Sequence, residues 1–218
     1  MKIGILTQPL RTNYGGLLQN YALQQVLIRA GHEVETLDQQ DRQVGWLHAQ
    51  LFRIKIHLLH LLSPARYRRP RYSPSSKEAA IIQRNTNHFI ECYIKRTSPI
   101  HAAAGFKAVA ETRGYEAYVV GSDQCWRPCY NQFLNAMFLD FDRRPDIKRV
   151  AYAASFGTDR WELTPEQTQM AAPLAQKFDA VTVREDSGVG LCKDHLGVEA
   201  VHVLDPTMLL TKEDYIRL

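Results

Sequence analysis

The sequence predicts an α/β fold built on a doubly wound, mostly parallel Rossmann-like sheet. Short apolar runs rich in β-branched residues, typical of strands buried on both faces, alternate along the chain with helical patterns. Six such runs alternating with helices make a sheet covered on both faces the economical arrangement. Several runs end abruptly in small polar residues, and in open α/β sheets ligands gather beyond the carboxyl ends of the strands. The pattern therefore predicts which edge of the sheet carries a site.

Composition and cysteine spacing limit the classes of protein. The 218 residues are 45% hydrophobic and 23% charged, with a net charge of +4, values that are ordinary for a soluble globular protein. The chain has neither a run of eighteen apolar residues nor a signal peptide at its N-terminus, which predicts a cytoplasmic protein. Cys125 and Cys129 are three residues apart, but no second pair of cysteines or histidines stands at a zinc spacing. We therefore predict free thiols, no metal site and no cofactor.

The first 38 residues predict a strand, loop, helix and strand in succession. Residues 2–7 form the first strand, residues 8–16 a loop, and residues 34–38 the second strand. The helix between them has one apolar face, and Gly31 ends it. In the loop, the paired glycines of Asn13-Tyr14-Gly15-Gly16 let the backbone approach an anion near a helix N-terminus. The motif is neither a dinucleotide fingerprint nor a P-loop, so a binding loop and a plain tight turn both remain open.

Residues 42–77 form a basic segment without any acidic residue. Its first part predicts an amphipathic helix with the apolar residues Trp46, Leu47, Leu51, Ile54, Leu58, Leu61 and Leu62. Its second part carries Arg66, Arg68, Arg69 and Arg71 among prolines and tyrosines. Such a segment can lie at the inner face of an anionic membrane, or it can pack its leucine face on the domain ahead of a solvated loop. No nucleic-acid-binding module accompanies the arginines, so we predict no nucleic-acid partner.

The middle of the chain predicts helices over 77–93 and 103–113, followed by a buried strand that ends at Val120. Gly121, Ser122, Asp123 and Gln124 follow this strand directly, in the position from which small polar groups reach a site. The alternative is a turn in which Asp123 bonds its own backbone. A long loop, residues 122–135, comes next.

The last third contributes three more strands and two helices. Residues 149–157 form a strand that ends in small polar residues, and Thr164 and Gln167 are the two partners of a capping box. Further strands follow over 180–183 and 200–204, and Gly197 ends the helix between them. Thr211 caps a new helix, so we predict a Rossmann-like domain over 1–210, variable and basic over 42–100, with 211–218 leading into a C-terminal domain. A natural C-terminus with a short docked helix is the alternative.

Five motifs, in order, give the chain a family resemblance. They are Asn13-Tyr14-Gly15-Gly16 with Leu18-Gln19-Asn20-Tyr21-Ala22-Leu23, residues 119–126, Tyr152-Ala153-Ala154-Ser155-Phe156-Gly157, Val183-Arg184-Glu185-Asp186-Ser187-Gly188 and Leu204-Asp205-Pro206-Thr207. Together they resemble the N-terminal half of the polysaccharide pyruvyl transferase family. The resemblance implies half of a two-domain transferase of GT-B-like architecture, with the site in the cleft between the halves. Family members are generally longer, which makes independent activity of this half an open question.

The resemblance implies a reaction and its partners. A pyruvyl group passes from phosphoenolpyruvate to two hydroxyls of a saccharide acceptor, lipid-linked or nucleotide-linked, as a ketal in bacterial cell-surface polysaccharide synthesis. Much of the phosphoenolpyruvate site, with its basic and histidine residues, is expected in the other half. The alternatives are a nucleotide-sugar glycosyltransferase of GT-B-like architecture and a truncated, non-catalytic glycan-binding module.

The chemistry of this reaction selects the candidate site residues. A donor that carries a phosphate and a carboxylate needs cationic partners, and the attacking hydroxyl needs a base. Arg184 is the candidate anion clamp and Asp123 the candidate catalytic acid–base group; the alternatives are a structural Arg184 paired with Glu185 or Asp186, and a turn-stabilising Asp123. The substrate-binding candidates are Asn13, Tyr14, Gly15, Gly16, Gly121, Ser122, Gln124 and Ser155. We expect the strand tips near residues 13, 123, 155 and 184 to line one rim.

Overall fold

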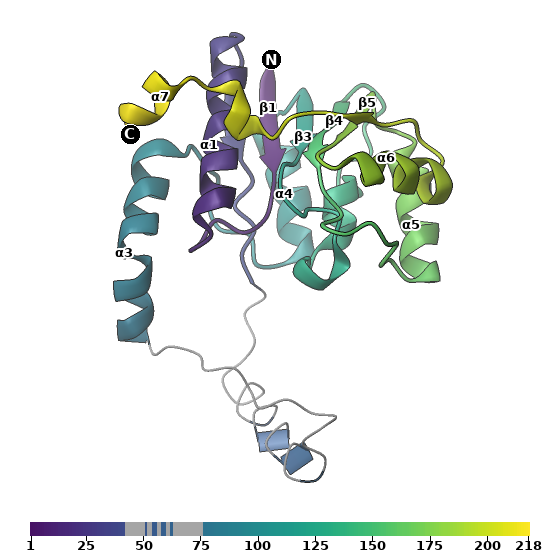
Figure 1. Ribbon diagram of the computed structural model, residues 1–218, viewed down its shortest axis with the longest axis horizontal. Helices are drawn as coiled ribbons and strands as arrows, with labels where there is room; N and C mark the ends of the chain where they lie inside the picture. The colour runs from purple at the N-terminus through teal and green to yellow at the C-terminus, as the bar shows by residue number, and fades with distance from the viewer. Residues whose placement is uncertain (42–50, 52–53, 56–57, 60–61, 63–75) are drawn as a thin grey trace. The chain divides into compact units, whose positions relative to one another are not determined.

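The structure is a computed structural model that describes residues 1–41, 51, 54–55, 58–59, 62 and 76–218 (Figure 1). The chain divides into two compact units, one of Met1–Asp41 with Asn85–Leu218 and the other of Arg42–Arg84. Of the predicted basic helix only residues 51, 54–55, 58–59 and 62 are described, and these are helical. The arginines predicted to contact a membrane, residues 66–71, lie outside the described residues. Among the helices that are described, none combines the length and the apolar character needed to cross a membrane.

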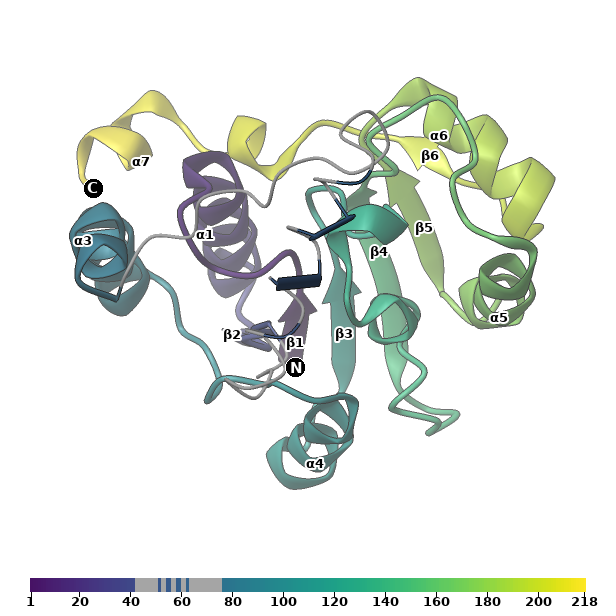
Figure 2. The same cartoon turned by 90° about the horizontal axis from the view of Figure 1, so that it is seen from below.

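One six-stranded sheet, all parallel, forms the centre of the first unit (Figure 2). Its order is β2-β1-β3-β4-β5-β6, which confirms the predicted α/β fold. The strands are β1 (Lys2–Leu6), β2 (Glu33–Thr36), β3 (Ala117–Val120), β4 (Lys148–Ala154), β5 (Ala180–Val183) and β6 (Val201–His202). The helices are α1 (Tyr14–Arg29), α3 (Ser76–Tyr93), α4 (Ala103–Arg113), α5 (Pro165–Ala175), α6 (Asp186–Leu191) and α7 (Lys212–Ile216).

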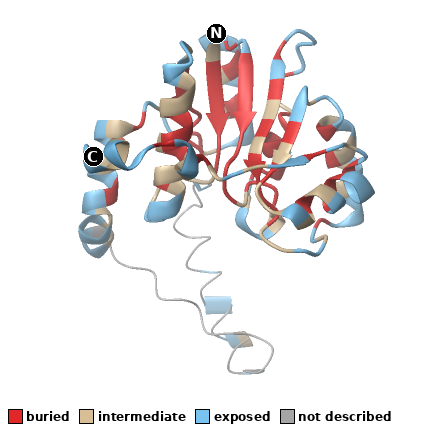
Figure 3. Cartoon of the chain, turned by 45° about the horizontal axis from the view of Figure 1, so that its top comes forward, coloured by how far each residue is buried: buried red, intermediate tan, exposed pale blue. Residues whose placement is uncertain are grey.

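The strand order decides which helix covers which face. Parallel crossovers are right-handed, so the direction in which a connection moves along the sheet decides the face on which its helix lies. The β1-to-β2 connection moves toward one side of the sheet, and all the later connections move toward the other. Accordingly α1 packs its Leu23 on one face, against Ile3 and Ile5 of β1. The opposite face carries α4, α5 and α6, which share a second core with Tyr118 and Val120 of β3. Figure 3 shows the central strands buried and the outer faces of the helices exposed.

The start of α1 corrects the predicted glycine loop. The helix begins at Tyr14, so Gly15 and Gly16 lie in its first turn and not in the loop before it. The reason is local, because Asn13 adopts an extended backbone and its side chain accepts a hydrogen bond from the backbone N–H of Gly16 at 3.3 Å. Gly31, with a φ of +86°, follows the end of the helix as predicted.

Two further elements differ from the prediction. The last strand, predicted over 200–204, pairs only at Val201–His202, because β6 is a sheet edge where Val201 and Leu204 are exposed. The predicted loop over 122–135 contains a 3-10 turn, η1 (Pro128–Tyr130), and another, η2 (Leu134–Phe138), follows it. Trp126 fixes this region, since it is fully buried, stacks on Phe138 and donates its indole N–H to the carbonyl of Met137 at 3.1 Å.

Candidate functional site

The sheet has a switch point between β1 and β3. From β1 the chain leads outward to β2, whereas from β3 it continues in the other direction, so the loops after β1 and β3 diverge. A crevice at the carboxyl edge is the usual result and the usual place of a ligand in such folds. An open cleft of about 440 Å³ lies there. It is lined by Gln8, Pro9, Arg11, Thr12, Asn13, Asp41, Asp123, Gln124 and Tyr130.

Asp123 is one of the two carboxylates that line this cleft, with Asp41, and its backbone is held firmly. Its carbonyl accepts hydrogen bonds from the N–H groups of Cys125 at 2.7 Å and Ser155 at 3.1 Å. Its φ of +71° is in the left-handed region that aspartate tolerates better than most residues. Of its carboxylate oxygens, Oδ1 accepts from the backbone N–H of Gln124 at 2.9 Å and Oδ2 from Nδ2 of Asn13 at 3.3 Å. The residue therefore stabilises its turn and also presents a fixed carboxylate to the cleft.

Glycines make room for this carboxylate. A Cβ at Gly16 would lie 3.3 Å from Oδ2 of Asp123, a tight contact, so the glycine eases the close approach of the first turn of α1 to the carboxylate. Gly121 has a φ of +128°, and a Cβ there would lie 2.0 Å from the carbonyl oxygen of Tyr152. Both glycines therefore allow backbone segments to meet where a larger residue would separate them.

Arg184 follows β5 and joins the neighbouring loops at the carboxyl edge. Its Nε donates to Glu185 at 3.0 Å and its Nη2 to Oγ of Ser155 at 3.2 Å. Its Nη1 lies 3.5 Å from Oδ2 of Asp205 and 3.8 Å from Oδ1 of Asp123. Burial acts to lower the pKa of Arg184, but the hydrogen bond to Glu185 and the charges of the nearby carboxylates outweigh it and raise the pKa above its usual value.

The predicted rim is confirmed in its geometry. Asn13 bonds Asp123, Asp123 lies beside Arg184, and Arg184 bonds Ser155, so the four predicted strand tips meet at one edge. The pairing of Arg184 with Glu185, one of the two alternatives for this arginine, is also present, whereas Asp186 bonds the N–H of Ser187.

The other predicted substrate-binding residues occupy different positions. Tyr14 is exposed at the start of α1, and Gln124 lines the cleft while its Oε1 accepts from Arg127 at 3.0 Å. Ser122 is fully buried, and in the described part of the chain its Oγ has no hydrogen-bond partner. Gly15 lies in the first turn of α1, near the side chain of Asn13.

Two residues of this region were not predicted as site residues. Asp205 follows the last strand, just as each of the other polar residues of the rim follows a strand of its own. This position was the signal in the sequence that could have identified Asp205 as a site residue. Its Oδ2 accepts from Nε2 of Gln19 and its Oδ1 from the N–H of Thr207 at 3.0 Å. Gln19 is on α1, and nothing in the local sequence indicates that it reaches the far end of the chain.

The remaining cations of the cleft region are paired as well. Arg11, which lines the cleft, lies 2.6 Å from Asp41. Arg127 donates two bonds to Glu162, at 2.8 and 3.1 Å. Arg11, Arg127 and Arg184 are therefore guanidinium groups that already hold carboxylates.

Comparison with known proteins identifies the family. A sequence model described as polysaccharide pyruvyl transferase matches residues 13–218. The chain belongs to the polysaccharide pyruvyl transferase family. The match starts at Asn13 and spans every residue of the Asp123–Arg184–Asp205 group, so the rim at the carboxyl edge is part of the family's own domain. A search of curated proteins gave no match.

Two solved structures resemble the chain over most of its length. One is an alpha-glucosyltransferase in complex with UDP and a 13-mer DNA containing a HMU base, with 13% identity and a TM-score of 0.43 over 93% of this chain and 41% of that one. The other is an alpha-glucosyltransferase in complex with UDP, with 11% identity and a TM-score of 0.41 over 94% of this chain and 44% of that one. The chain thus spans about two fifths of the length of the solved chains it matches.

Proposed function

We propose that the cleft beside Asp123 binds a saccharide acceptor, and that the protein takes part in transfer of a pyruvyl group from phosphoenolpyruvate to two of its hydroxyls as a ketal. The observation that carries the proposal is a carboxylate fixed at the switch point, next to amide side chains and an exposed aromatic ring. The process is the synthesis of a bacterial cell-surface polysaccharide.

The lining of the cleft suits hydroxyl groups. Sugars offer donors and acceptors in equal measure together with an apolar C–H face, so they are bound by amides, carboxylates and aromatic rings. Asn13 and Gln124 supply amides, and Tyr130 is 57% exposed. Asp123 receives two hydrogen bonds on a carboxylate that has about four lone-pair sites, which leaves room for an acceptor hydroxyl.

In this proposal Asp123 orients the acceptor hydroxyl and accepts its proton as the hydroxyl attacks. A positioned base of this kind contributes about 10²–10⁴-fold to the rate. Arg184 helps to hold Asp123 in place, and this positioning role suits an arginine that already contacts three carboxylates.

Phosphoenolpyruvate, the anionic donor, requires binding groups other than Arg184 and the carboxylates around it. Three carboxylates surround the one guanidinium of Arg184, so the group as a whole is negative and repels a phosphate and a carboxylate. We therefore assign phosphoenolpyruvate to cationic side chains outside this group. If Arg184 were the anion clamp, phosphoenolpyruvate would first have to displace Glu185 and Asp205 from it.

The test is turnover by the full-length protein. Phosphate release from phosphoenolpyruvate is measured with a panel of saccharides, and the product is checked by mass spectrometry for one added pyruvyl ketal. Asp123→Asn should lower kcat by about 10²–10⁴-fold and change KM for the acceptor only slightly. The matched control Asp194→Asn, an exposed aspartate on another segment, should be unchanged. Absence of ketal with every acceptor, together with calorimetric binding of a nucleoside diphosphate and not of phosphoenolpyruvate, would contradict the proposal.

A further inference from the structure

Two cavities lie at the amino-terminal edge of the sheet, at the other end of the strands from Asp123. Each has a volume of about 720 Å³, and both border the loop of residues 139–147, which leads into β4. Residues of α4 line one and residues of α5 line the other, and we refer to them as the α4 cavity and the α5 cavity. Their charges differ, and the difference indicates which of them is a binding site.

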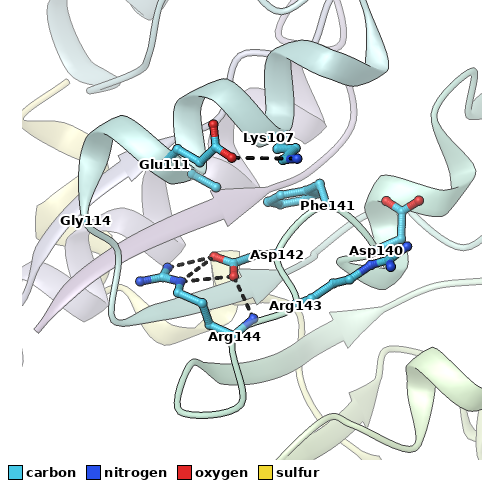
Figure 4. Close-up of a pocket in the computed structure, with 9 residues that line it drawn as sticks. Lys107, Glu111, Gly114, Asp140, Phe141, Asp142, Arg143 and Arg144 are labelled. Atoms are coloured by element: carbon cyan, nitrogen blue, oxygen red, sulfur yellow. Dashed lines mark hydrogen bonds and ion pairs between the residues drawn. The ribbon is translucent and has the colours of Figure 1, made fainter.

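The α4 cavity is electrically balanced. Figure 4 shows its two ion pairs, Lys107 with Glu111 at 3.8 Å and Arg144 with Asp142 at 2.7 Å. The remaining charged residues of its lining are Asp140 and Arg143, one of each sign. A cavity lined in this way has no net attraction for an ion.

The α5 cavity has an excess of positive charge. Its charged lining consists of Arg143, Arg144, Arg149, Lys177, Asp140 and Asp142. Since Arg144 is bound to Asp142, the lining that remains is Arg143, Arg149 and Lys177 against Asp140, an excess of two positive charges. Clefts lined mainly by one sign of charge concentrate the opposite ion.

Arg149 is the unusual member of this lining. It is only 7% exposed, and its guanidinium donates to the carbonyls of Ile147 at 2.9 Å, Asp142 at 2.9 Å and Arg144 at 2.7 Å. Among the described residues it forms no ion pair through its side chain, since Asp179 binds its backbone N–H and is itself paired with Lys148. The guanidinium of Arg149 is thus held by carbonyl dipoles, and its positive potential reaches the cavity that it lines.

Much of the remaining lining of the α5 cavity is apolar. It includes Phe138, Leu139, Met170, Pro173 and Leu174. A ligand that suits both the charged and the apolar residues is an anion attached to an apolar body. An excess of two positive charges matches a phosphate monoester, which carries about −1.5 to −2 at pH 7.

We propose that the α5 cavity binds a small organic phosphate that carries an apolar or aromatic group. The phosphate lies beside Arg143 and Lys177, within the field of Arg149, and the apolar group lies against Met170 and Leu174 of α5. This site is separate from the carboxyl-edge cleft, and the proposal does not depend on which reaction the protein catalyses.

The test is calorimetry on the full-length protein with three probes: 1-naphthyl phosphate, inorganic phosphate and 1-naphthol. Saturable binding of 1-naphthyl phosphate, about tenfold tighter than that of either other probe, is expected because the charged and the apolar residues of the cavity then both contribute to the affinity. Arg143→Gln and Lys177→Gln should each weaken it by about tenfold, since each removes one charge-assisted contact.

Two matched controls remove a positive charge elsewhere. Lys107→Gln changes the α4 cavity and Arg11→Gln changes the carboxyl-edge cleft, and neither should alter the affinity. The proposal is overturned if 1-naphthyl phosphate does not bind saturably, or if inorganic phosphate binds as tightly. It is equally overturned if the Lys107 or Arg11 variant loses as much affinity as the two α5-cavity variants.

Discussion

Replacement of Arg184 by methionine tests whether this side chain holds the carboxyl edge together. Methionine keeps much of the apolar stem and removes the charge together with the hydrogen bonds to Glu185 and Ser155. Three carboxylates, whose side chains are 13–34% exposed, would then face one another without a cation between them. Both the stability of the edge and the position of Asp123 should change.

The size of the effect follows from the burial of the group. At an effective dielectric constant of about 20, one pair of unit charges 3.5 Å apart gains about 5 kcal/mol, most of which desolvation offsets. Exposed pairs contribute about 0–1 kcal/mol, and loss of one partner of a buried pair costs about 3–5 kcal/mol. The side chain of Arg184 is 23% exposed, so we expect Arg184→Met to lower the free energy of unfolding by about 2–3 kcal/mol.

Urea unfolding at pH 7 measures this change, and Arg127→Met is the matched control. Arg127 has a similar side-chain exposure, 24%, but pairs with a single carboxylate, Glu162. The Arg127 variant should lose less stability, and Arg184→Lys should lie between Arg184→Met and the wild type because lysine keeps the charge without the planar fork. Added salt should restore part of the stability of Arg184→Met by screening the carboxylates. Equal losses for both methionine variants, or no effect of salt, would refute the reasoning.

Two further predictions concern stability away from the cleft. Burial acts to raise the pKa of Asp142, but the hydrogen bonds from Arg144 outweigh burial and lower the pKa. The Asp142–Arg144 pair therefore stabilises the fold above the unfolded pKa of aspartate, about 3.9, and this contribution is lost as the pH falls further. Because Arg144 is 44% exposed, Arg144→Met should cost only about 1–2 kcal/mol at pH 7, and urea unfolding at about pH 3 should show a smaller gap; a constant gap would contradict this linkage. Thr164→Ala removes the capping box with Gln167 and should cost about 1 kcal/mol in the same assay. Thr112→Ala removes a hydroxyl in the last turn of α4 that bonds a carbonyl one turn earlier, and it should be nearly neutral.

The elements that the sequence predicted well are those whose ends are defined locally. The capping box at Thr164 and the glycines at 31 and 197 act on their own neighbours in the chain, so the helices end where the sequence indicates. The start of α1 was placed too late because paired glycines suggest a loop, whereas the side-chain cap from Asn13 decides the outcome. The last strand was predicted too long, because its pairing depends on a neighbouring strand and not on its own residues.

The candidate site was predictable to the extent that it depends on topology. Residues 13, 123, 155 and 184 each lie beyond the carboxyl end of a strand in a parallel sheet. They therefore meet at one edge of the sheet, because the strand order alone brings them there. Of the three carboxylates around Arg184, only Asp205 was not predicted as a partner or a site residue, because it lies 21 residues further along the chain. The α5 cavity was not predictable either, because Arg149 has the sequence context of an ordinary strand residue.

The contacts of Asp205 connect the carboxyl edge of the sheet to residues 206–216. Its Oδ2 accepts from Gln19 of α1 and lies near Arg184. Its Oδ1 accepts from the N–H of Thr207, so that Asp205 caps the 3-10 turn η4 (Pro206–Leu209). Further along, Tyr215 donates to the carbonyl of Thr207 at 2.8 Å and Arg29 of α1 pairs with Asp214 at 2.6 Å. The charge balance around Asp123 therefore depends on a segment that folds back onto the first helix, and displacement of residues 205–216 should disturb the cleft even though none of them lines it.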